Sequence, residues 1–101
     1  MSRTAVIRYE TLPEAADENH KAVAKVFDQL AKENPEGLRY TSFRLADGVS
    51  FVHIVVMEGD DDPLSGLSAF QEFQNGIKER LAGTPVRGEA TMIGSYRFLS
   101  D

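Results

Sequence analysis

The sequence predicts an α+β domain of the ferredoxin-like βαββαβ class, in which two helices cover one face of a four-stranded antiparallel sheet. Two observations carry this prediction. Four segments are rich in β-branched and aromatic residues, and two others have apolar residues at helical spacing. Their order along the chain is strand, helix, strand, strand, helix, strand. The chain has 101 residues, the usual length of one domain, so we expect a single domain over residues 1–101.

The first strand and the first helix are predicted in the N-terminal third of the chain. Residues 3–10 alternate between polar and β-branched or aromatic side chains, which favours a strand. Thr11, Pro13 and Glu14 are typical of a helix start, with the threonine as its cap. The run 34–37, Asn-Pro-Glu-Gly, ends the helix. The apolar residues at helical spacing between these signals are Ala16, Val23, Val26, Phe27 and Leu30.

The rest of the chain predicts a hairpin, a second helix and a last strand. Residues 38–45 and 49–57 are predicted strands, joined by a tight turn at Asp47 and Gly48 because such turns favour residues that tolerate a positive φ. A capping box that begins at Ser68 opens the second helix. After a break at residues 83–85, residues 86–99 are predicted to form one long strand. The apolar face of the second helix carries Phe70, Phe73, Ile77 and Leu81.

Charge and composition exclude several classes of function. The formal net charge is −5, from 11 Lys and Arg against 16 Asp and Glu, so we expect neither nucleic acid nor an anionic membrane as a partner. The sequence has no cysteine, which excludes disulfides and zinc–thiolate sites. The two histidines, His20 and His53, lack the spacing of metal ligands, so we expect no metal. No apolar run could span a bilayer and the N-terminus leads directly into a strand-like segment, which favours a cytoplasmic protein.

Apolar residues on both faces of the predicted sheet indicate a homodimer. In the third strand Val52, Ile54 and Val56 share one face, and His53 lies on the other. A monomer rarely exposes a surface of this kind, so we expect two sheets to pack against each other in a dimeric α+β barrel. The alternative is one covered face with scattered apolar residues on the surface. The other residues concerned are Phe51, Val55 and Met57 beside His53, Ala90, Met92, Tyr96 and Phe98 on one face of the last strand, and Ile93 and Leu99 on its other face.

His20 is the first candidate for chemistry because it shares the apolar stripe of the first helix with Val23 and Phe27. With the neighbouring Asn19 it could bind a ligand or act as acid and base near neutral pH. The alternative is a half-solvated residue at the end of the helix. His53, in the middle of an apolar strand, either contacts a ligand or is satisfied by a neighbouring group.

Two further polar groups have alternative interpretations. Tyr40 shares a strand face with Ser42 and Arg44, so this strip either presents donors to an anionic or phenolic ligand or fills an interface. The acidic run 60–62 lacks the alternating ligands of a calcium loop. We interpret it as a solvated loop that favours the dipole of the following helix.

Three segments carry a family resemblance: residues 34–40 (NPEGLRY), 49–53 (VSFVH) and 69–74 (AFQEFQ). In them the chain resembles the antibiotic biosynthesis monooxygenase-like domains of the dimeric α+β barrel superfamily. The resemblance implies a pocket between the sheet and the helices of each subunit, and an activity among cofactor-free oxygenation of polycyclic phenols, haem degradation and lactone isomerisation. This sequence has no tryptophan and no histidine in its second helix, so it departs from the Asn–Trp–Tyr set of the oxygenases and from the Asn, Trp and His of the haem degraders.

We therefore expect one of two functions. The first is a cofactor-independent monooxygenase or isomerase that acts on a small apolar, aromatic molecule, with His20 as base, Asn19 orienting an oxygen and no cofactor. The second is a non-catalytic module of the same dimeric fold that binds a small ligand or another protein. The side chains expected to contact the ligand are Tyr9, Phe27, His53, Phe70 and Phe73.

Overall fold

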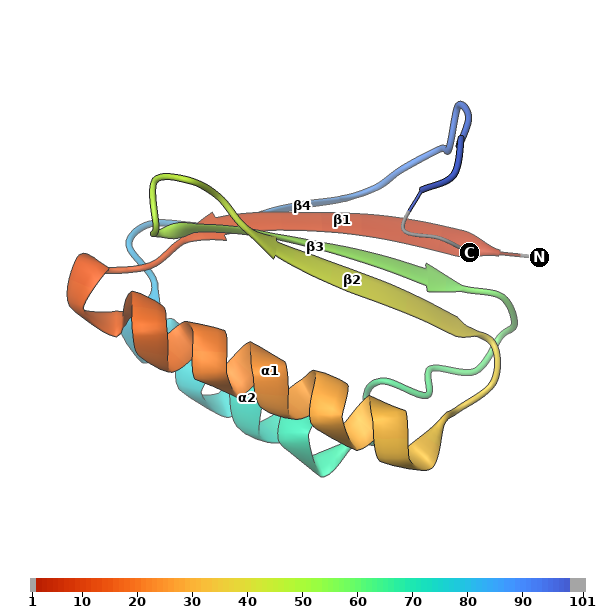
Figure 1. Ribbon diagram of the computed structural model, residues 1–101, viewed down its shortest axis with the longest axis horizontal. Helices are drawn as coiled ribbons and strands as arrows, with labels where there is room; N and C mark the ends of the chain where they lie inside the picture. The colour runs from red at the N-terminus through yellow and green to blue at the C-terminus, as the bar shows by residue number, and fades with distance from the viewer. Residues whose placement is uncertain (1, 99–101) are drawn as a thin grey trace.

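Two helices lie side by side beneath one face of a four-stranded antiparallel sheet (Figure 1). The computed structural model describes residues 2–98 of the chain. The strand order is β2-β3-β1-β4, which confirms the predicted ferredoxin-like βαββαβ class. The elements are β1 (Arg3–Glu10), the short 3₁₀ turn η1 (Pro13–Ala15), α1 (Ala16–Glu33), β2 (Leu38–Arg44), β3 (Ser50–Met57), α2 (Ser68–Arg80) and β4 (Val86–Glu89).

The core fills the space between the sheet and the helices. Phe51, His53 and Val55 of β3 are buried, whereas the residues between them are half-buried on the opposite face. The alternation predicted for the third strand is therefore confirmed, and it turns a histidine towards the helices. The buried apolar residues that pack together there are Tyr9, Val23, Val26, Phe51, Val55, Leu64, Leu67 and Phe73.

The hairpin between β2 and β3 forms where the sequence predicts it. Gly48 adopts a φ of 81°, in the left-handed region that favours glycine. The Asp47 carboxylate accepts hydrogen bonds from the backbone N–H of Val49 at 2.9 Å and of Ser50 at 2.8 Å. It also accepts the Ser50 hydroxyl, and these bonds hold the pKa of Asp47 below its usual value. The register of β3 against β2 is thereby fixed at the turn.

Neither helix begins with the side-chain cap that the sequence predicts. The Thr11 hydroxyl donates to the carbonyl of Val49 at 3.4 Å, and the chain makes the turn η1 before α1 starts. At the start of α2 the cap comes from another helix, because the side-chain oxygen of Gln29 accepts the backbone N–H of Ala69 at 2.9 Å. The Ser68 hydroxyl donates to the same Gln29 oxygen at 3.4 Å instead of capping its own helix. A contact between α1 and α2 therefore provides the cap that the sequence predicts from within α2.

The prediction of a long last strand over residues 86–99 is wrong, since β4 ends at Glu89. The register gives the reason: Val86 lies opposite Arg8 and Glu89 opposite Ala5, so β4 runs towards the N-terminal end of β1. The backbone N–H of Ala90 still donates to the carbonyl of Thr4 at 2.8 Å. Only one more residue of β1, Arg3, lies beyond Thr4 in that direction. Residues 91–98, which we call the arm, have no strand to pair with in the described part of the chain; Leu99 lies outside that part.

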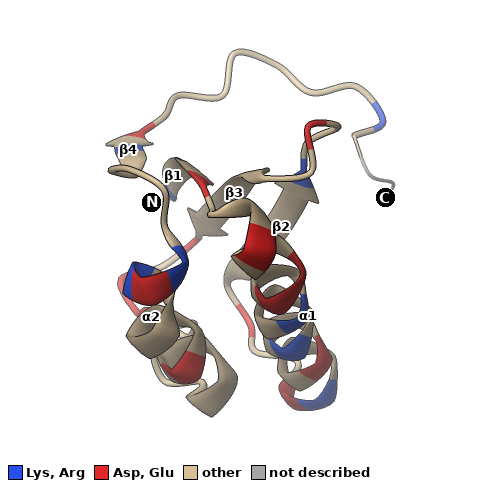
Figure 2. Cartoon of the chain, turned by 90° about the vertical axis from the view of Figure 1, so that its left-hand side faces the viewer, with Lys and Arg blue, Asp and Glu red and all other residues tan. Residues whose placement is uncertain are grey.

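The arm leaves the sheet on the side opposite the helices (Figures 1 and 2). It carries exposed apolar side chains, among them Ile93 and Tyr96. Both helices carry charged residues along their length (Figure 2). Within residues 2–98, no helix combines the length and the hydropathy that crossing a membrane requires.

The cap that Gln29 provides can be tested by substitution. Gln29→Ala should lower the free energy of unfolding by about 1 kcal/mol, because the first turn of α2 loses the acceptor of a backbone N–H. Gln29→Glu keeps an oxygen acceptor at a helix N-terminus and should retain most of the stability. Urea unfolding followed by circular dichroism measures both variants. Equal stability of the alanine variant and the unmodified chain would contradict this account.

Candidate functional site

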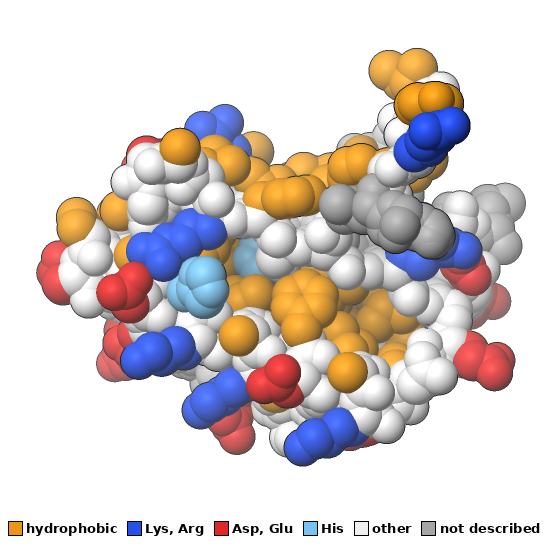
Figure 3. All heavy atoms as spheres, viewed as in Figure 1, with side chains coloured by type: hydrophobic (Ala, Val, Ile, Leu, Met, Phe, Trp, Pro, Cys, Tyr) orange, Lys and Arg blue, Asp and Glu red, His pale blue; other side chains and the backbone are white. Residues whose placement is uncertain are grey.

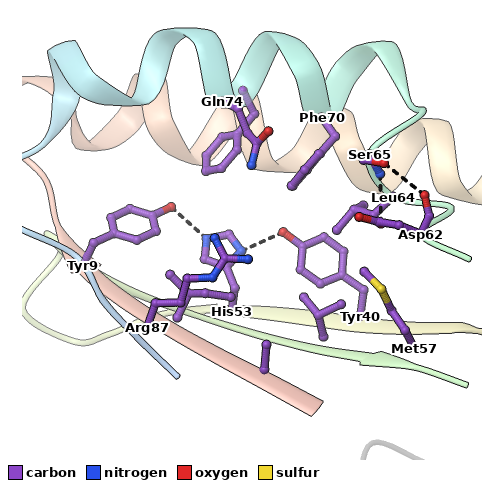
Figure 4. Close-up of a pocket in the computed structure, with 14 residues that line it drawn as sticks. Tyr9, Tyr40, His53, Met57, Asp62, Leu64, Ser65, Phe70, Gln74 and Arg87 are labelled. Atoms are coloured by element: carbon purple, nitrogen blue, oxygen red, sulfur yellow. Dashed lines mark hydrogen bonds between the residues drawn. The ribbon is translucent and has the colours of Figure 1, made fainter. Parts of the chain in front are cut away.

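A cavity of about 280 Å³ lies between the sheet and α2 (Figure 4). Most of its wall is apolar, and the polar groups that reach it include the hydroxyls of Tyr9 and Tyr40 and the ring of His53. This volume and this mixture of groups suit a small molecule of one or two rings that carries a few polar atoms. The apolar wall consists of Ala5, Ile7, Val55, Met57, Leu64, Phe70 and Phe73.

His53 is the polar centre of the cavity floor, with 4% of its surface exposed. Its Nε2 lies 2.7 Å from the hydroxyl of Tyr9, and its Nδ1 lies 2.7 Å from the hydroxyls of both Tyr40 and Ser42. The sheet register produces this arrangement. Ser42 of β2 is directly opposite His53, and the two tyrosines are its diagonal neighbours on β2 and β1. Figure 4 shows the two phenols pointing at the imidazole from opposite sides.

A chain of hydrogen bonds continues from Tyr9 into the helix layer. Asn19 of α1 is fully buried, and its Nδ2 donates to the Tyr9 hydroxyl at 3.0 Å. Arg80 of α2 donates from Nε to the Asn19 side-chain oxygen at 2.9 Å. The network therefore connects both helices to β1, β2 and β3 across the core. Every buried side-chain nitrogen or oxygen of the described residues has a hydrogen-bond partner.

Burial keeps His53 and the two tyrosines of the site neutral. It lowers the pKa of His53 from 6.5 to about 4, because an imidazolium would lose its hydration there. Burial also raises the pKa of Tyr9 to about 12, against the opposing effect of the hydrogen bond from Asn19. The pKa of Tyr40 is raised by burial as well. At neutral pH the site holds a neutral imidazole between two un-ionised phenols, an arrangement that can relay a proton.

The charged groups near the cavity are Arg87 and Asp62. Arg87 of β4 points towards the cavity, and Asp62 lies in the loop before α2 (Figure 4). The Asp62 carboxylate accepts the backbone N–H of Ser65 at 3.2 Å. Within residues 2–98, no hydrogen bond or ion pair engages the exposed guanidinium of Arg87. Arg87 is therefore available to a negative charge on a bound molecule.

The structure separates the two residues predicted as catalytic. Asn19 lies in the buried network, whereas His20 is exposed and borders β2 together with Val23 and Phe27. One residue along a helix is a rotation of about 100°, so burying Asn19 turns His20 outward. His20 lies beside Arg44, with Nη1 of the arginine 3.3 Å from its Nδ1. Both line a hollow of about 340 Å³ between α1 and β2, on the face where Figure 3 shows apolar side chains between helix and sheet.

Four of the five side chains predicted to contact a ligand line the cavity: Tyr9, His53, Phe70 and Phe73. The fifth, Phe27, lies in the hollow with His20 and stacks on Tyr40, with ring centroids 4.8 Å apart. Contact of these side chains with a ligand stays a prediction. Their convergence follows from the fold, since β1 and β3 each turn one ring, and α2 turns two, to the same space.

Sequence reasoning missed Arg80 and Arg87. In the sequence Arg87 indicates only a cross-strand or edge charge pair with Glu89, because the pairing of the last strand could not be known in advance. Arg80 did leave a signal, because α2 contains a glycine four residues before it. A Cβ on Gly76 would lie 2.6 Å from Nη1 of Arg80, so the glycine leaves room for the buried guanidinium. A glycine in mid-helix, one turn before an arginine, indicates such a packing.

Several solved structures have a similar fold. The chain is similar to Rv0793 from Mycobacterium tuberculosis, with a TM-score of 0.74 and 15% identity over 94% of this chain and 98% of the other. A candidate antibiotic biosynthesis monooxygenase from Nitrosomonas europaea matches with a TM-score of 0.75 and 12% identity over 91% and 90%. SnoaB, a cofactor-independent oxygenase from Streptomyces nogalater, matches with a TM-score of 0.68 and 21% identity over 93% and 95%.

Identities this low show the fold alone. The chain has the fold that the candidate antibiotic biosynthesis monooxygenase and SnoaB share, as its resemblance to the monooxygenase-like domains implies. No protein-family model and no curated protein matches the sequence. The chemistry of the site has to be argued from its own residues.

The buried His53 should make folding stability depend on pH. The unfolded chain takes up this proton near pH 6.5 and the folded chain only near pH 4, so the free energy of unfolding should fall as the pH is lowered through this window. The loss between pH 7.5 and pH 5 should be about 2 kcal/mol. Urea unfolding at a series of pH values measures it.

His53→Gln removes the titrating group and should abolish that loss, while His20→Gln should leave it in place. A loss that disappears in the His20 variant and persists in the His53 variant would contradict the assignment. Proton NMR gives an independent reading, since the His53 ring should not titrate between about pH 5 and pH 8.

Proposed function

We propose that this chain is a cofactor-independent enzyme that removes a proton from a small aromatic molecule bound in the cavity. The observation that carries the proposal is His53, buried, neutral and held between the hydroxyls of Tyr9 and Tyr40. Two phenols and an imidazole at 2.7 Å form a relay along which a proton can move without a charge being exposed to water. The apolar wall selects an aromatic substrate, and the cavity volume limits its size.

The proton transfer follows from the pKa values. Tyr9 does not ionise at neutral pH, so it accepts the substrate's proton only while it passes its own to Nε2 of His53. The carbanion or enolate that forms lies next to the new imidazolium, and the attraction between them offsets the burial that otherwise lowers the pKa of His53. Arg87 adds a second positive charge near the developing negative one.

Two outcomes are open to such a carbanion without a cofactor. Return of the proton to another carbon gives an isomerase. Reaction with dioxygen gives an oxygenase: the electron pair of the carbanion forms a C–O bond, the abstracted proton returns to give a hydroperoxide, and loss of the second C–H proton breaks the O–O bond and releases water. The net change converts a CH₂ group and O₂ into a carbonyl and one water, with the substrate as the reductant. The likeness in fold to SnoaB, a cofactor-independent oxygenase, supports the second outcome.

A second candidate function is a non-catalytic module that binds a small ligand. One observation favours it: the hydrogen bonding of His53 is complete among the described residues, through Tyr9, Tyr40 and Ser42. A fully satisfied buried network can serve to fix a unique core. Binding of an aromatic molecule without any proton exchange would identify this function.

We also propose that the chain works as a homodimer whose sheets pack face to face. Opposite the helices, the sheet presents Val52, Ile54 and Val56 of β3, which are half-buried. The arm adds apolar groups on the same side, including Tyr96, which is 81% exposed. A second copy would cover both surfaces, and burying them supplies about 25 cal/mol for each Å² of apolar area.

Proton abstraction can be measured with 2-tetralone, whose CH₂ group between ring and carbonyl is acidic. The protein should accelerate exchange of these protons in D₂O above the uncatalysed rate, as followed by proton NMR. His53→Gln should lower the protein-dependent rate by about 100-fold, because the base is lost. Tyr9→Phe should have a similar effect, whereas Tyr96→Phe, the matched change on the exposed arm, should have none.

The result also decides between the two histidines. Loss of exchange in His20→Gln with full activity in His53→Gln would assign the base to His20 and overturn the proposal. Binding of 2-tetralone without exchange would favour the binding module. Consumption of dioxygen during exchange, followed with an oxygen electrode, would identify the oxygenase.

Light scattering tests the dimer. The chain should elute with about twice its monomer mass, the value for a two-fold dimer. Val52→Asp should convert it to a monomer, because the carboxylate would be buried without a partner between the sheets. Ala31→Asp, the same kind of change on the exposed surface of α1, should leave the dimer intact. A monomeric unmodified chain at micromolar concentration would exclude this assembly.

A further inference from the structure

We infer that Arg80, which does not reach the cavity, determines which ring nitrogen of His53 carries the proton. Arg80 and Asn19 are then positioning residues. They determine in which direction the hydroxyls that line the cavity donate their hydrogen bonds. The catalytic meaning of this inference rests on the proposed function. The protonation of the ring does not, and it can be measured without a substrate.

The first step concerns the amide of Asn19. A guanidinium can only donate, so the Asn19 atom 2.9 Å from Nε of Arg80 must be the side-chain oxygen. The amide nitrogen is thereby turned to the Tyr9 hydroxyl, 3.0 Å away, and it donates to that oxygen. An asparagine beside Tyr9 alone could present either atom. Arg80 removes the choice.

The second step concerns the imidazole. Tyr9 already accepts from Asn19, and its own hydrogen can be donated to Nε2 of His53 at 2.7 Å. The opposite arrangement would leave this hydrogen without an acceptor among the described residues. Nε2 is therefore the acceptor. Since His53 is neutral, its one N–H is on Nδ1, where the hydroxyls of Tyr40 and Ser42 both lie at 2.7 Å.

The position of Arg80 is itself closely determined. The side chain is 6% exposed, its Nη2 donates to the carbonyl of Phe73 at 3.3 Å, and its guanidinium lies 5.6 Å from the centre of the Phe73 ring. Gly76 leaves the space that it fills. No carboxylate forms an ion pair with it within residues 2–98. Its Nε is thus held on Asn19 by packing and not by a mobile counterion.

The consequence is a direction for the proton relay. Nε2 faces Tyr9 as an acceptor, so protons enter His53 from the side of Tyr9. Nδ1 holds the hydrogen that can leave towards Tyr40 or Ser42. The two phenols look equivalent in distance, but the network assigns Tyr9 to the base side and Tyr40 to the acid side.

The ring ¹⁵N resonances of His53, correlated with its carbon-bound protons by NMR, report which nitrogen is protonated. The unmodified chain should show Nδ1–H. Asn19→Asp keeps the shape and the contact with Arg80, but it turns an acceptor towards Tyr9, which then donates to the carboxylate and accepts from the ring. The two His53 nitrogen resonances should therefore exchange character, to Nε2–H. Asn75→Asp, the same change at an exposed position of α2, should leave them unchanged.

Arg80→Met supplies a second test, because it frees the amide of Asn19 to rotate and should give a mixture of the two forms. Nε2–H in the unmodified chain would overturn the inference, and so would an unchanged ring in folded Asn19→Asp. These readings need no ligand. Failure of 2-tetralone exchange alongside the expected ring signals would reject the proposed function and leave the inference standing.

Discussion

The hydrogen bond between Tyr9 and His53 is the interaction on which the rest of the site depends. A histidine in the core is unfavourable unless both ring nitrogens have partners, because an unsatisfied buried polar group costs about 1–3 kcal/mol. The fold supplies these partners from both neighbouring strands, and the register of β1 and β2 against β3 brings them within reach. Asn19 then donates to the Tyr9 hydroxyl, and Arg80 donates to the side-chain oxygen of Asn19. Removing one member would leave the next unpaired.

The two faces of the sheet serve different purposes. The face towards the helices combines a core with a polar network, so its apolar residues surround the His53 cluster instead of forming a continuous layer. The opposite face has no polar network of this kind in β3, where Val52, Ile54 and Val56 alternate with the inward residues. The proposed proton transfer and the proposed dimer contact therefore lie on opposite sides of a single strand. A substitution at an odd-numbered position of β3 should therefore affect the site, and one at an even-numbered position should affect the proposed dimer contact.

Much of the fold could be predicted from the sequence, because its signals are local. The alternation of β3 and the turn at Gly48 both depend on residues close to them in the chain, and both are confirmed. The length of β4 could not be predicted, since it depends on where its antiparallel partner β1 begins. The cap of α2 is provided by Gln29, 39 residues before Ser68, and no local pattern reveals such a contact. Helical spacing put His20 on the apolar stripe of α1 with Asn19 as its neighbour, but the structure buries Asn19 and leaves His20 exposed.

His20 and His53 show why residue type alone identifies a site poorly. Both were candidates because an imidazole titrates near neutral pH, and the structure gives them opposite surroundings. His20 is exposed and lies beside the guanidinium of Arg44. His53 is dehydrated and bonded on both nitrogens, which makes it a weak base towards water and a better one towards a donor whose anion remains beside it. In the proposed reaction such a group acts on a bound molecule that leaves a negative charge in the cavity, and the phenols on either side determine where that proton can enter and leave.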